Sequence, residues 1–204
     1  MPTRALFPTL LYQERLRARG GNDLNARLLR ECQQLESDDA AGRRWSKRNY
    51  PGGYTSYGSA SRMHHLSPTF AALESALARH VGRFARLLAL DLRERPLAMT
   101  DCWVNIMRHG VVHSSHLHPM STISGTYYVK TPRGCPGLKF EDPRLDRMMA
   151  APPRRLQSSA HPSWFVLPAT TGTVVLFESW LRHEVPPSAV RGTRVSISFN
   201  FSWF

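Results

Sequence analysis

The stretch RVSISFNFSW, residues 194–203, decides the fold class, because apolar and small polar side chains alternate along it. Successive side chains of a β-strand point to opposite faces, so this pattern predicts a strand with one apolar face. Further candidate strands follow one another from Met99 onward: Thr100–Arg108, Ile123–Lys130, Gly137–Glu141, Ser163–Leu167, Thr173–Phe177 and His183–Val185. They are short and are separated by Gly and Pro, which is typical of an all-β core.

The first part of the chain shows helical spacing instead. Asn22 or Asp23 caps a predicted helix that ends near Leu35, and Ser67-Pro68 opens a second helix that continues to about Leu90. Residues 37–62 are polar and rich in Gly, Ser, Arg and Tyr, so we expect a long loop there, and a second loop at 150–162. Together these elements predict a mainly β fold with N-terminal helices and a double-stranded β-helix core, that is, a cupin-like jelly roll.

Length and composition indicate one domain. The chain has 204 residues, of which 42% are hydrophobic. We expect a single domain over 1–204, with 1–95 as helical and loop support and 96–204 as the jelly-roll core. No apolar run approaches the roughly 18 residues of a membrane span, and the N-terminus lacks the pattern of a signal peptide. Cys32, Cys102 and Cys135 lack metal-type spacing, so we expect free thiols and a cytoplasmic location.

The charge balance is strongly basic. Lys and Arg total 27 against 15 Asp and Glu, which gives a net charge of +12. This balance favours an acidic partner, but the arginines are spread along the chain and no nucleic-acid motif of known spacing occurs. We therefore expect a small-molecule or peptide substrate, acidic ones included, while nucleic acid has no motif to support it. The sequence leaves the oligomeric state open, a homodimer included.

Three histidines form a candidate metal site. His116 and His118 stand two residues apart, so on an extended chain their rings point to the same side. His183, brought in by a distant strand, would complete one face of an octahedral metal ion. A structural role for each ring remains the alternative. His113 has the wrong parity for the same strand face, so we expect it to lie in the surroundings of the site or at the surface.

Other polar residues of the predicted strands are candidates for binding a ligand. Arg194 and Ser196 share a strand face and could hold a carboxylate, unless Arg194 faces solvent at the strand end. Tyr127 and Tyr128 alternate, so one should face the core and the other should face out. Asn105 is expected to point inward, toward a ligand or a buried water. Phe140-Glu141-Asp142-Pro143-Arg144 predicts a strand and a turn with an Asp142–Arg144 pair.

Several short motifs follow one another along the chain: Trp103-x-Asn105, His116-x-His118-Pro119, Ser124-Gly125-x-Tyr127-Tyr128-Val129, Phe140-x-Asp142-Pro143-Arg144, Phe177-x-Ser179-Trp180-Leu181-x-His183-x-Val185 and Arg194-x-Ser196-Ile197-Ser198-Phe199-Asn200. Leu6-Phe7-Pro8-Thr9 and Gly52-Gly53-Tyr54-x-Ser56 add to this set. In this combination the chain resembles the 2-oxoglutarate/Fe(II)-dependent oxygenase family of bacteria and phages, in the jelly-roll oxygenase superfamily. The resemblance extends over essentially the whole chain, although each motif alone is weak.

The resemblance implies a reaction and a set of site residues. The cofactors would be Fe(II), 2-oxoglutarate and O2, and the enzyme would be a dioxygenase that hydroxylates a substrate while 2-oxoglutarate is decarboxylated to succinate. His116, His118 and His183 would be the metal ligands, and Arg194 with Ser196 would hold the distal carboxylate of 2-oxoglutarate. Tyr128 and Asn105 would contact its other oxygens.

The chain departs from the family at one ligand. The superfamily binds iron with His-x-Asp/Glu and a distal His, whereas His118 stands in the carboxylate position of this sequence. A three-histidine face is neutral, which favours a different metal or weaker retention of iron. Two other functions therefore stay open. One is a cupin-like metal dioxygenase that uses three histidines without 2-oxoglutarate, and the other is a non-catalytic jelly-roll binding module.

Overall fold

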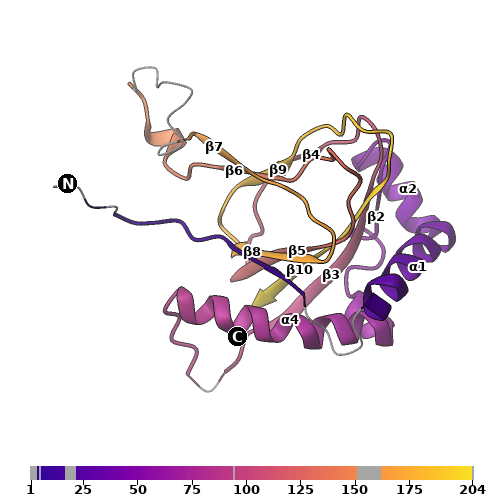
Figure 1. The fold of residues 1–204 in the computed structure, drawn as a ribbon, viewed down its shortest axis with the longest axis horizontal. Coiled ribbons are helices and arrows are strands. Elements are labelled where there is room, and N and C mark those ends of the chain that lie inside the picture. The colour runs from indigo at the N-terminus through magenta and orange to yellow at the C-terminus, as the bar shows by residue number, and fades with distance from the viewer. Residues whose placement is uncertain (1–3, 5, 17–21, 94, 151–161, 204) are drawn as a thin grey trace.

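Two facing β-sheets form the centre of the molecule. The structure, a computed structural model, describes residues 4, 6–16, 22–93, 95–150 and 162–203. Within these residues the strands form a six-stranded and a four-stranded sheet, both antiparallel, and helices cover the far side of the larger sheet (Figure 1). This arrangement confirms the predicted jelly-roll core with N-terminal helices.

The two sheets are assembled from strands that lie far apart in the sequence. The larger sheet has the order β1 (Tyr12–Arg15), β8 (Thr173–Glu178), β5 (Ile123–Lys130), β10 (Arg194–Ser202), β3 (Ala98–Met107) and β2 (Tyr54–Thr55). The smaller sheet has the order β4 (His113–His116), β9 (His183–Val185), β6 (Leu138–Glu141) and β7 (Trp164–Leu167). The seven predicted strands are confirmed to within two residues at each end. Strands β1, β2 and β4 were not predicted, because such short segments show no clear alternation.

The helices are α1 (Asn22–Asp38), α2 (Ala40–Asn49), α3 (Met63–Leu66) and α4 (Pro68–Leu87), and a 3-10 turn, η1, covers Leu145–Arg147. The predicted cap of α4 is confirmed, because the Ser67 hydroxyl accepts the backbone N–H groups of Thr69 and Phe70. The helical spacing predicts that Leu24, Leu28, Leu29 and Cys32 share one face of α1; three of them are buried, and Leu29 is partly buried.

The predicted loop over 37–62 is wrong in part, because ten of its residues form α2 and two form β2. Helix α2 begins where Asp39 accepts the backbone N–H of Gly42 at 2.8 Å. Its buried residues are Gly42 and Ser46, so it packs through small side chains and shows no apolar stripe. The tyrosine-containing segment is held as well, since the Tyr54 hydroxyl donates to Asp39 at 2.9 Å.

Both faces of the larger sheet are buried. One face packs against the helices, and alternate residues of β10, including Ile197 and Phe199, belong to that apolar cluster. The other face looks into the space between the sheets. Tyr127 and Tyr128 therefore lie on opposite faces but are both buried, so the expectation that one of them faces out is wrong. The physical reason is the helical layer, which covers the face that would otherwise meet solvent.

Two further expectations concern the periphery. Strands β6 and β7 run out together from the body of the molecule, with η1 near their far end (Figure 1). Here the predicted Asp142–Arg144 pair is confirmed, with two guanidinium–carboxylate hydrogen bonds of 2.9 and 2.8 Å.

The loop predicted at 150–162 lies almost entirely outside the described residues. Among the residues that are described, no helix is long and apolar enough to cross a membrane.

Candidate metal centre

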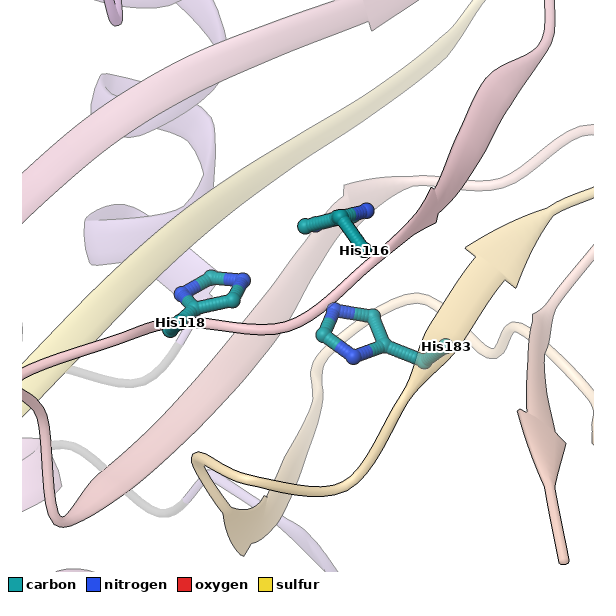
Figure 2. Close-up of side chains that lie close together, drawn as sticks. All are labelled: His116, His118 and His183. Carbon is teal, nitrogen blue, oxygen red and sulfur yellow. The ribbon is translucent and has the colours of Figure 1, made fainter. Parts of the chain in front are cut away.

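Three histidine rings converge between the two sheets. His116 ends β4, His118 follows two residues later, and His183 begins β9 (Figure 2). Strands β4 and β9 pair antiparallel, which places His116 directly opposite His183. The backbone N–H of His118 donates to the carbonyl of Ser179 at 3.0 Å, and this bond holds the segment beyond β4. One ring nitrogen from each histidine lies within 4.8 Å of the other two, which is a spacing that one metal ion can bridge.

Each ring is oriented by a hydrogen bond at Nδ1. His116 Nδ1 lies 2.7 Å from the carbonyl of Ser114, and His183 Nδ1 lies 2.9 Å from the carbonyl of Leu181. His118 Nδ1 lies 2.7 Å from Oδ1 of Asn200. These oxygens only accept, so each Nδ1 carries the proton and each Nε2 presents a lone pair. His118 Nε2 is buried without a hydrogen-bond partner, as a nitrogen intended for a metal would be.

Burial keeps the three rings neutral. It lowers the pKa of His183 to about 2 and that of His118 to about 4, and it lowers the pKa of His116 as well. Each positive ring would also repel the others. Neutral imidazole is the form that ligates metal, so at neutral pH the three rings are in the form that could bind one. Because the cluster contains no carboxylate among the described residues, these ligands bring no charge of their own.

His113 lies closer to the site than its parity predicts. Its ring stacks on the ring of His116, with centroids 4.6 Å apart and planes 13° apart. The register explains this: three steps along β4, from His113 to His116, oppose two steps along β9, from Val185 to His183. The extra residue is a β-bulge, which re-aims the side chains on one side of it. A bulge has no reliable sequence signal, so the parity argument fails at this point.

Asn200 is a site residue that was not predicted from the sequence. Its Oδ1 accepts His118 Nδ1–H and also the Ser124 hydroxyl at 2.8 Å, while its Nδ2 donates to Asp101 at 3.2 Å. The usable signal was its place on β10, since Asn200 follows Arg194, Ser196 and Ser198 at even spacing. The inward face of one strand therefore contributes to both the metal site and the region beyond it.

Arg194 lies on the same inward face and is buried, with 2% of its surface exposed. Its Nη1 donates to the Ser196 hydroxyl at 3.0 Å and to the Met107 sulfur at 3.3 Å, and its guanidinium lies 5.0 Å from the centre of the Tyr128 ring. Its Nε has no hydrogen-bond partner, and no carboxylate of the described residues pairs with it. A strand-end arginine in solvent is thus excluded.

The two weaker candidates are also buried nearby. Asn105 donates through Nδ2 to the Ser198 hydroxyl at 3.0 Å, while its Oδ1 has no partner. The hydroxyl of Tyr128 is buried without a hydrogen-bond partner as well. Unsatisfied buried polar atoms are rare and commonly mark a place where a ligand or water binds.

Two cavities meet at the histidines. A cavity of about 680 Å³ opens between β2, β3 and β4, and its wall includes Trp45, Tyr57 and Trp103. A second cavity of about 20 Å³ extends inward and is lined by Asn105, Arg194, Ser196 and their neighbours. Trp103, His113, His116 and His118 line both cavities. A ligand in either cavity would therefore lie next to the metal position.

A sequence comparison relates the strand-rich half of the chain to a known family. A family model described as "Putative 2OG-Fe(II) oxygenase" matches residues 101–200, where 2OG denotes 2-oxoglutarate. The matched segment begins at Asp101 and ends at Asn200, and it contains the three histidines, Arg194 and Ser196. A comparison with curated proteins gives no match.

Solved structures agree in fold. A prolyl-4-hydroxylase from Pseudomonas putida is 16% identical with a TM-score of 0.63, and the match covers 96% of this chain and 94% of that one. HygX from Streptomyces hygroscopicus, solved with nickel and 2-oxoglutarate bound, is 13% identical with a TM-score of 0.63, and the match covers 95% and 83%. A 2OG-Fe(II) oxygenase family protein from Burkholderia pseudomallei is 17% identical with a TM-score of 0.50, and the match covers 68% of this chain and 58% of that one. The resemblance inferred from the sequence motifs is confirmed: residues 101–200, about half of the chain, match the 2OG-Fe(II) oxygenase family model, and the solved structures share the fold.

Proposed function

We propose that this protein is a non-haem Fe(II)- and 2-oxoglutarate-dependent dioxygenase that hydroxylates an organic substrate. The observation that carries the proposal is the pairing of two incomplete sites across one small cavity. Three neutral imidazoles stand on one side, and a buried guanidinium without an acidic partner stands on the other, as far as the structure describes the chain. A metal ion on one side and a carboxylate on the other would satisfy both.

His116, His118 and His183 are the proposed metal ligands. They would bind through Nε2, because each Nδ1 already donates to an oxygen. Three facial nitrogens suit Fe(II) as well as other first-row metals, and they leave coordination positions open. When bound, Fe(II) with 2-oxoglutarate and O2 would supply the oxidation, in which hydroxylation accompanies decarboxylation to succinate.

Arg194 and Ser196 are the proposed site for the distal carboxylate of 2-oxoglutarate. Arg presents a planar fork that matches a carboxylate, and the Ser196 hydroxyl already lies on that fork. An arginine so fully buried without an acidic partner is unfavourable on its own, so a bound carboxylate would compensate for its desolvation. The Tyr128 hydroxyl, which has no hydrogen-bond partner, is proposed to donate to one of the remaining oxygens. Asn105 is proposed to donate to another through Nδ2, which carries two hydrogens and gives only one to Ser198.

Binding of 2-oxoglutarate must move side chains. A cavity of about 20 Å³ has room for about one water molecule, so a dicarboxylate enters only if its walls open. The lining residues Leu138 and Val185 belong to the smaller sheet, and Arg194 is free of any ion pair to a described carboxylate that would fix it. The protein's part is then to orient the co-substrate and to keep water away from the metal.

The larger cavity is the proposed substrate site. Trp45, Tyr57 and Trp103 form a row of edge-on aromatic contacts, with ring centroids 6.3 and 5.1 Å apart, that leads toward His118. Of the described residues that line the cavity, Arg62 and Asp101 carry charge, while the histidine rings are neutral because burial lowers their pKa. We infer a small-molecule or peptide substrate with a planar or apolar group, carrying at most one acidic group next to Arg62.

Anaerobic titration with Fe(II) and then with 2-oxoglutarate tests the proposed cofactors and residues. We expect a weak visible charge-transfer band in the wild-type protein. Arg194→Ala should bind metal normally but need far more 2-oxoglutarate, whereas His118→Ala should lose metal and band together. Arg144→Ala, which removes an exposed guanidinium, is the matched control. Loss of metal in Arg194→Ala would contradict the assignment of that residue.

One alternative has an observation in its favour. The neutral three-histidine set also suits a cupin-like metal dioxygenase that needs no 2-oxoglutarate. That function predicts metal binding without the charge-transfer band. A non-catalytic binding module predicts neither metal binding nor the band, and no candidate substrate would stimulate turnover of 2-oxoglutarate.

The substrate class has its own test. We expect 2-oxoglutarate turnover to rise with short aromatic peptides or aromatic small molecules and to be insensitive to a single-stranded oligonucleotide. Stimulation by the oligonucleotide would contradict the inference from the cavity lining. The cytoplasmic location, the single domain over 1–204 and the homodimer stay predictions.

A further inference from the structure

Asn200 joins a metal-ligand candidate to a carboxylate through two hydrogen bonds. Its Oδ1 accepts from His118 Nδ1 at 2.7 Å, and its Nδ2 donates to Asp101 Oδ2 at 3.2 Å. A carboxylate only accepts hydrogen bonds, so the amide nitrogen must face Asp101 and the amide oxygen must face His118. The hydrogen bond to Asp101 thus ensures that the His118 ring faces the amide oxygen of Asn200 and not its nitrogen.

The surroundings hold this amide in one orientation. Asn200 is buried, with 7% of its surface exposed. Its Oδ1 also accepts from Ser124, whose hydroxyl lies 2.7 Å from the hydroxyl of Ser179. Asp101 is fixed in turn by the hydroxyl of Thr100 at 2.9 Å. Every member of this network therefore has a partner, which makes it rigid.

We propose that Asn200 is a positioning residue that orients the His118 ring and connects it to Asp101, whose carboxylate supplies the negative charge that three neutral ligands lack. The three histidines include no carboxylate, and the hydrogen bonds that lead from His118 through Asn200 end at one. Metal-bound histidines commonly donate their other ring N–H to a carboxylate or carbonyl, which fixes the ring and raises its basicity. Here a neutral amide lies between the ring and the carboxylate.

The proposal rests on the metal site of the proposed function but not on 2-oxoglutarate. Its test therefore uses Co²⁺ alone, followed by visible absorbance, with the dissociation constant obtained by competition against a chelator. Asn200→Leu keeps the size of the side chain and removes both hydrogen bonds. We expect it to weaken Co²⁺ binding by about 10–100-fold and to alter the Co²⁺ spectrum.

Asn25→Leu is the matched control. Asn25 is also an amide with two hydrogen bonds, to the Tyr127 hydroxyl and the Val129 carbonyl, but it lies in α1 outside the larger sheet. We expect it to lower the melting temperature of the metal-free protein while Co²⁺ affinity stays that of the wild type. Equal Co²⁺ affinity in Asn200→Leu and Asn25→Leu would overturn the proposal.

Two further variants separate the charge from the orientation. Asp101→Asn retains an acceptor for the Asn200 amide but removes the charge, so its loss of Co²⁺ affinity should fall between those of Asn25→Leu and Asn200→Leu. The double exchange Asp101→Asn with Asn200→Asp swaps the amide and the carboxylate. The negative charge then lies at position 200, in direct contact with the His118 ring, and the hydrogen bond between positions 101 and 200 is retained. The double variant should bind Co²⁺ at least as tightly as the wild type.

The outcomes are distinct from those of the proposed function. If Asp101→Asn binds Co²⁺ as tightly as the wild type, the charge of Asp101 has no part in metal binding. If the double exchange binds Co²⁺ as weakly as Asn200→Leu does, the proposal is overturned. If the wild type binds Co²⁺ but never responds to 2-oxoglutarate, the proposed function fails while the role of Asn200 stands. A wild type that binds no Co²⁺ overturns both.

Discussion

The two faces of strand β10 are both buried, but one carries apolar side chains and the other polar ones. The outward face packs on the helices and carries four apolar residues: Val195, Ile197, Phe199 and Phe201. The inward face carries five polar residues: Arg194, Ser196, Ser198, Asn200 and Ser202. Both faces are largely buried, so exposure to water does not explain the alternation.

The neighbouring strands repeat this division. On β5, Tyr127 packs outward, where its hydroxyl is satisfied by Asn25, whereas Tyr128 points inward and its hydroxyl has no partner. On β3, Val104 packs outward and Asn105 points inward with one unsatisfied oxygen. The outward face thus stabilises the fold by apolar burial, and the inward face retains polar atoms whose partners would come with a ligand.

Truncation on the outward face should have the largest effect on stability. Phe199 is fully buried, and Phe199→Ala should lower the free energy of unfolding by about 3–5 kcal/mol because it leaves a cavity. Ser198→Ala, its neighbour on the inward face, removes the hydrogen bond to Asn105 and a long one of 3.5 Å to Thr126, and should cost about 1 kcal/mol. Urea unfolding of the metal-free proteins gives both values. Equal losses of stability would contradict the view that the outward face stabilises the fold more than the inward face does.

Replacement of the inward arginine should separate binding from stability. Arg194→Met keeps an unbranched side chain in the site but removes a buried charge that has no acidic partner among the described residues. We expect 2-oxoglutarate binding to weaken by about 2–5 kcal/mol, because the carboxylate loses its fork. The free energy of unfolding of the metal-free protein should stay the same or rise. Calorimetric titration and urea unfolding measure the two effects, with Arg144→Met as the control at an exposed site.

A loss of stability in Arg194→Met comparable to that in Phe199→Ala would contradict this comparison. It would mean that the inward face also stabilises the fold, and that the guanidinium is satisfied by Ser196, Met107 and the Tyr128 ring without a ligand.

The sequence predicted the fold well where alternation or helical spacing was long. Strand β5 has the predicted bounds, and the Ser67 cap of α4 is confirmed. Helix α2 could not be recognised, because the residues it buries are Gly42 and Ser46 rather than an apolar stripe. Propensity and capping by Asp39 form this helix, and hydrophobic periodicity does not report them.

For the site, residue types and spacing predicted which side chains gather but not their surroundings. The three histidines converge and Arg194 is buried near them, as the strand pattern predicts. His113 lies in the surroundings of the site, as expected, but on the same side as His116, because a bulge breaks the parity of β4. The bond between Asn200 and His118 joins residues 82 positions apart, and only the fold brings them together.

A methyl group added to the centre of the sheet gives a smaller test of the outward face. A Cβ at Gly125 would lie 2.5 Å from Phe199 and 2.6 Å from the backbone oxygen of Val175, so neither side can yield easily. Gly125→Ala should cost about 1–3 kcal/mol. Gly82→Ala is the control, because its Cβ would meet only the end of Arg86 at 4.0 Å. That helix substitution should stabilise by about 0.4–1 kcal/mol, since it restricts the unfolded chain.

Both glycine variants can be followed by thermal unfolding at neutral pH. A neutral or stabilising effect of Gly125→Ala would mean that β5 and β10 move apart readily, contrary to a closely packed outward face.

The smallest expected effect concerns His64, which lies beside the outward face in α3 and not at the metal. Burial lowers its pKa below the usual 6.5, and the adjacent His65 ring, 4.1 Å away, adds to this. Below pH 6.5 the unfolded chain therefore binds a proton that the folded chain does not. The contribution of His64 to stability is fully present above pH 6.5 and is lost as the pH falls, by at most about 1.4 kcal/mol per pH unit.

His64→Leu should therefore make the decline in stability between pH 7.5 and 5 shallower. Urea unfolding of the metal-free protein at several pH values gives the two slopes. Metal-site histidines also titrate in the metal-free protein, but they are common to both variants, so the difference between the slopes belongs to His64. Identical slopes would mean that His64 is protonated as readily in the folded chain as in the unfolded one. The helical layer around α3 would then admit water, unlike the inward face.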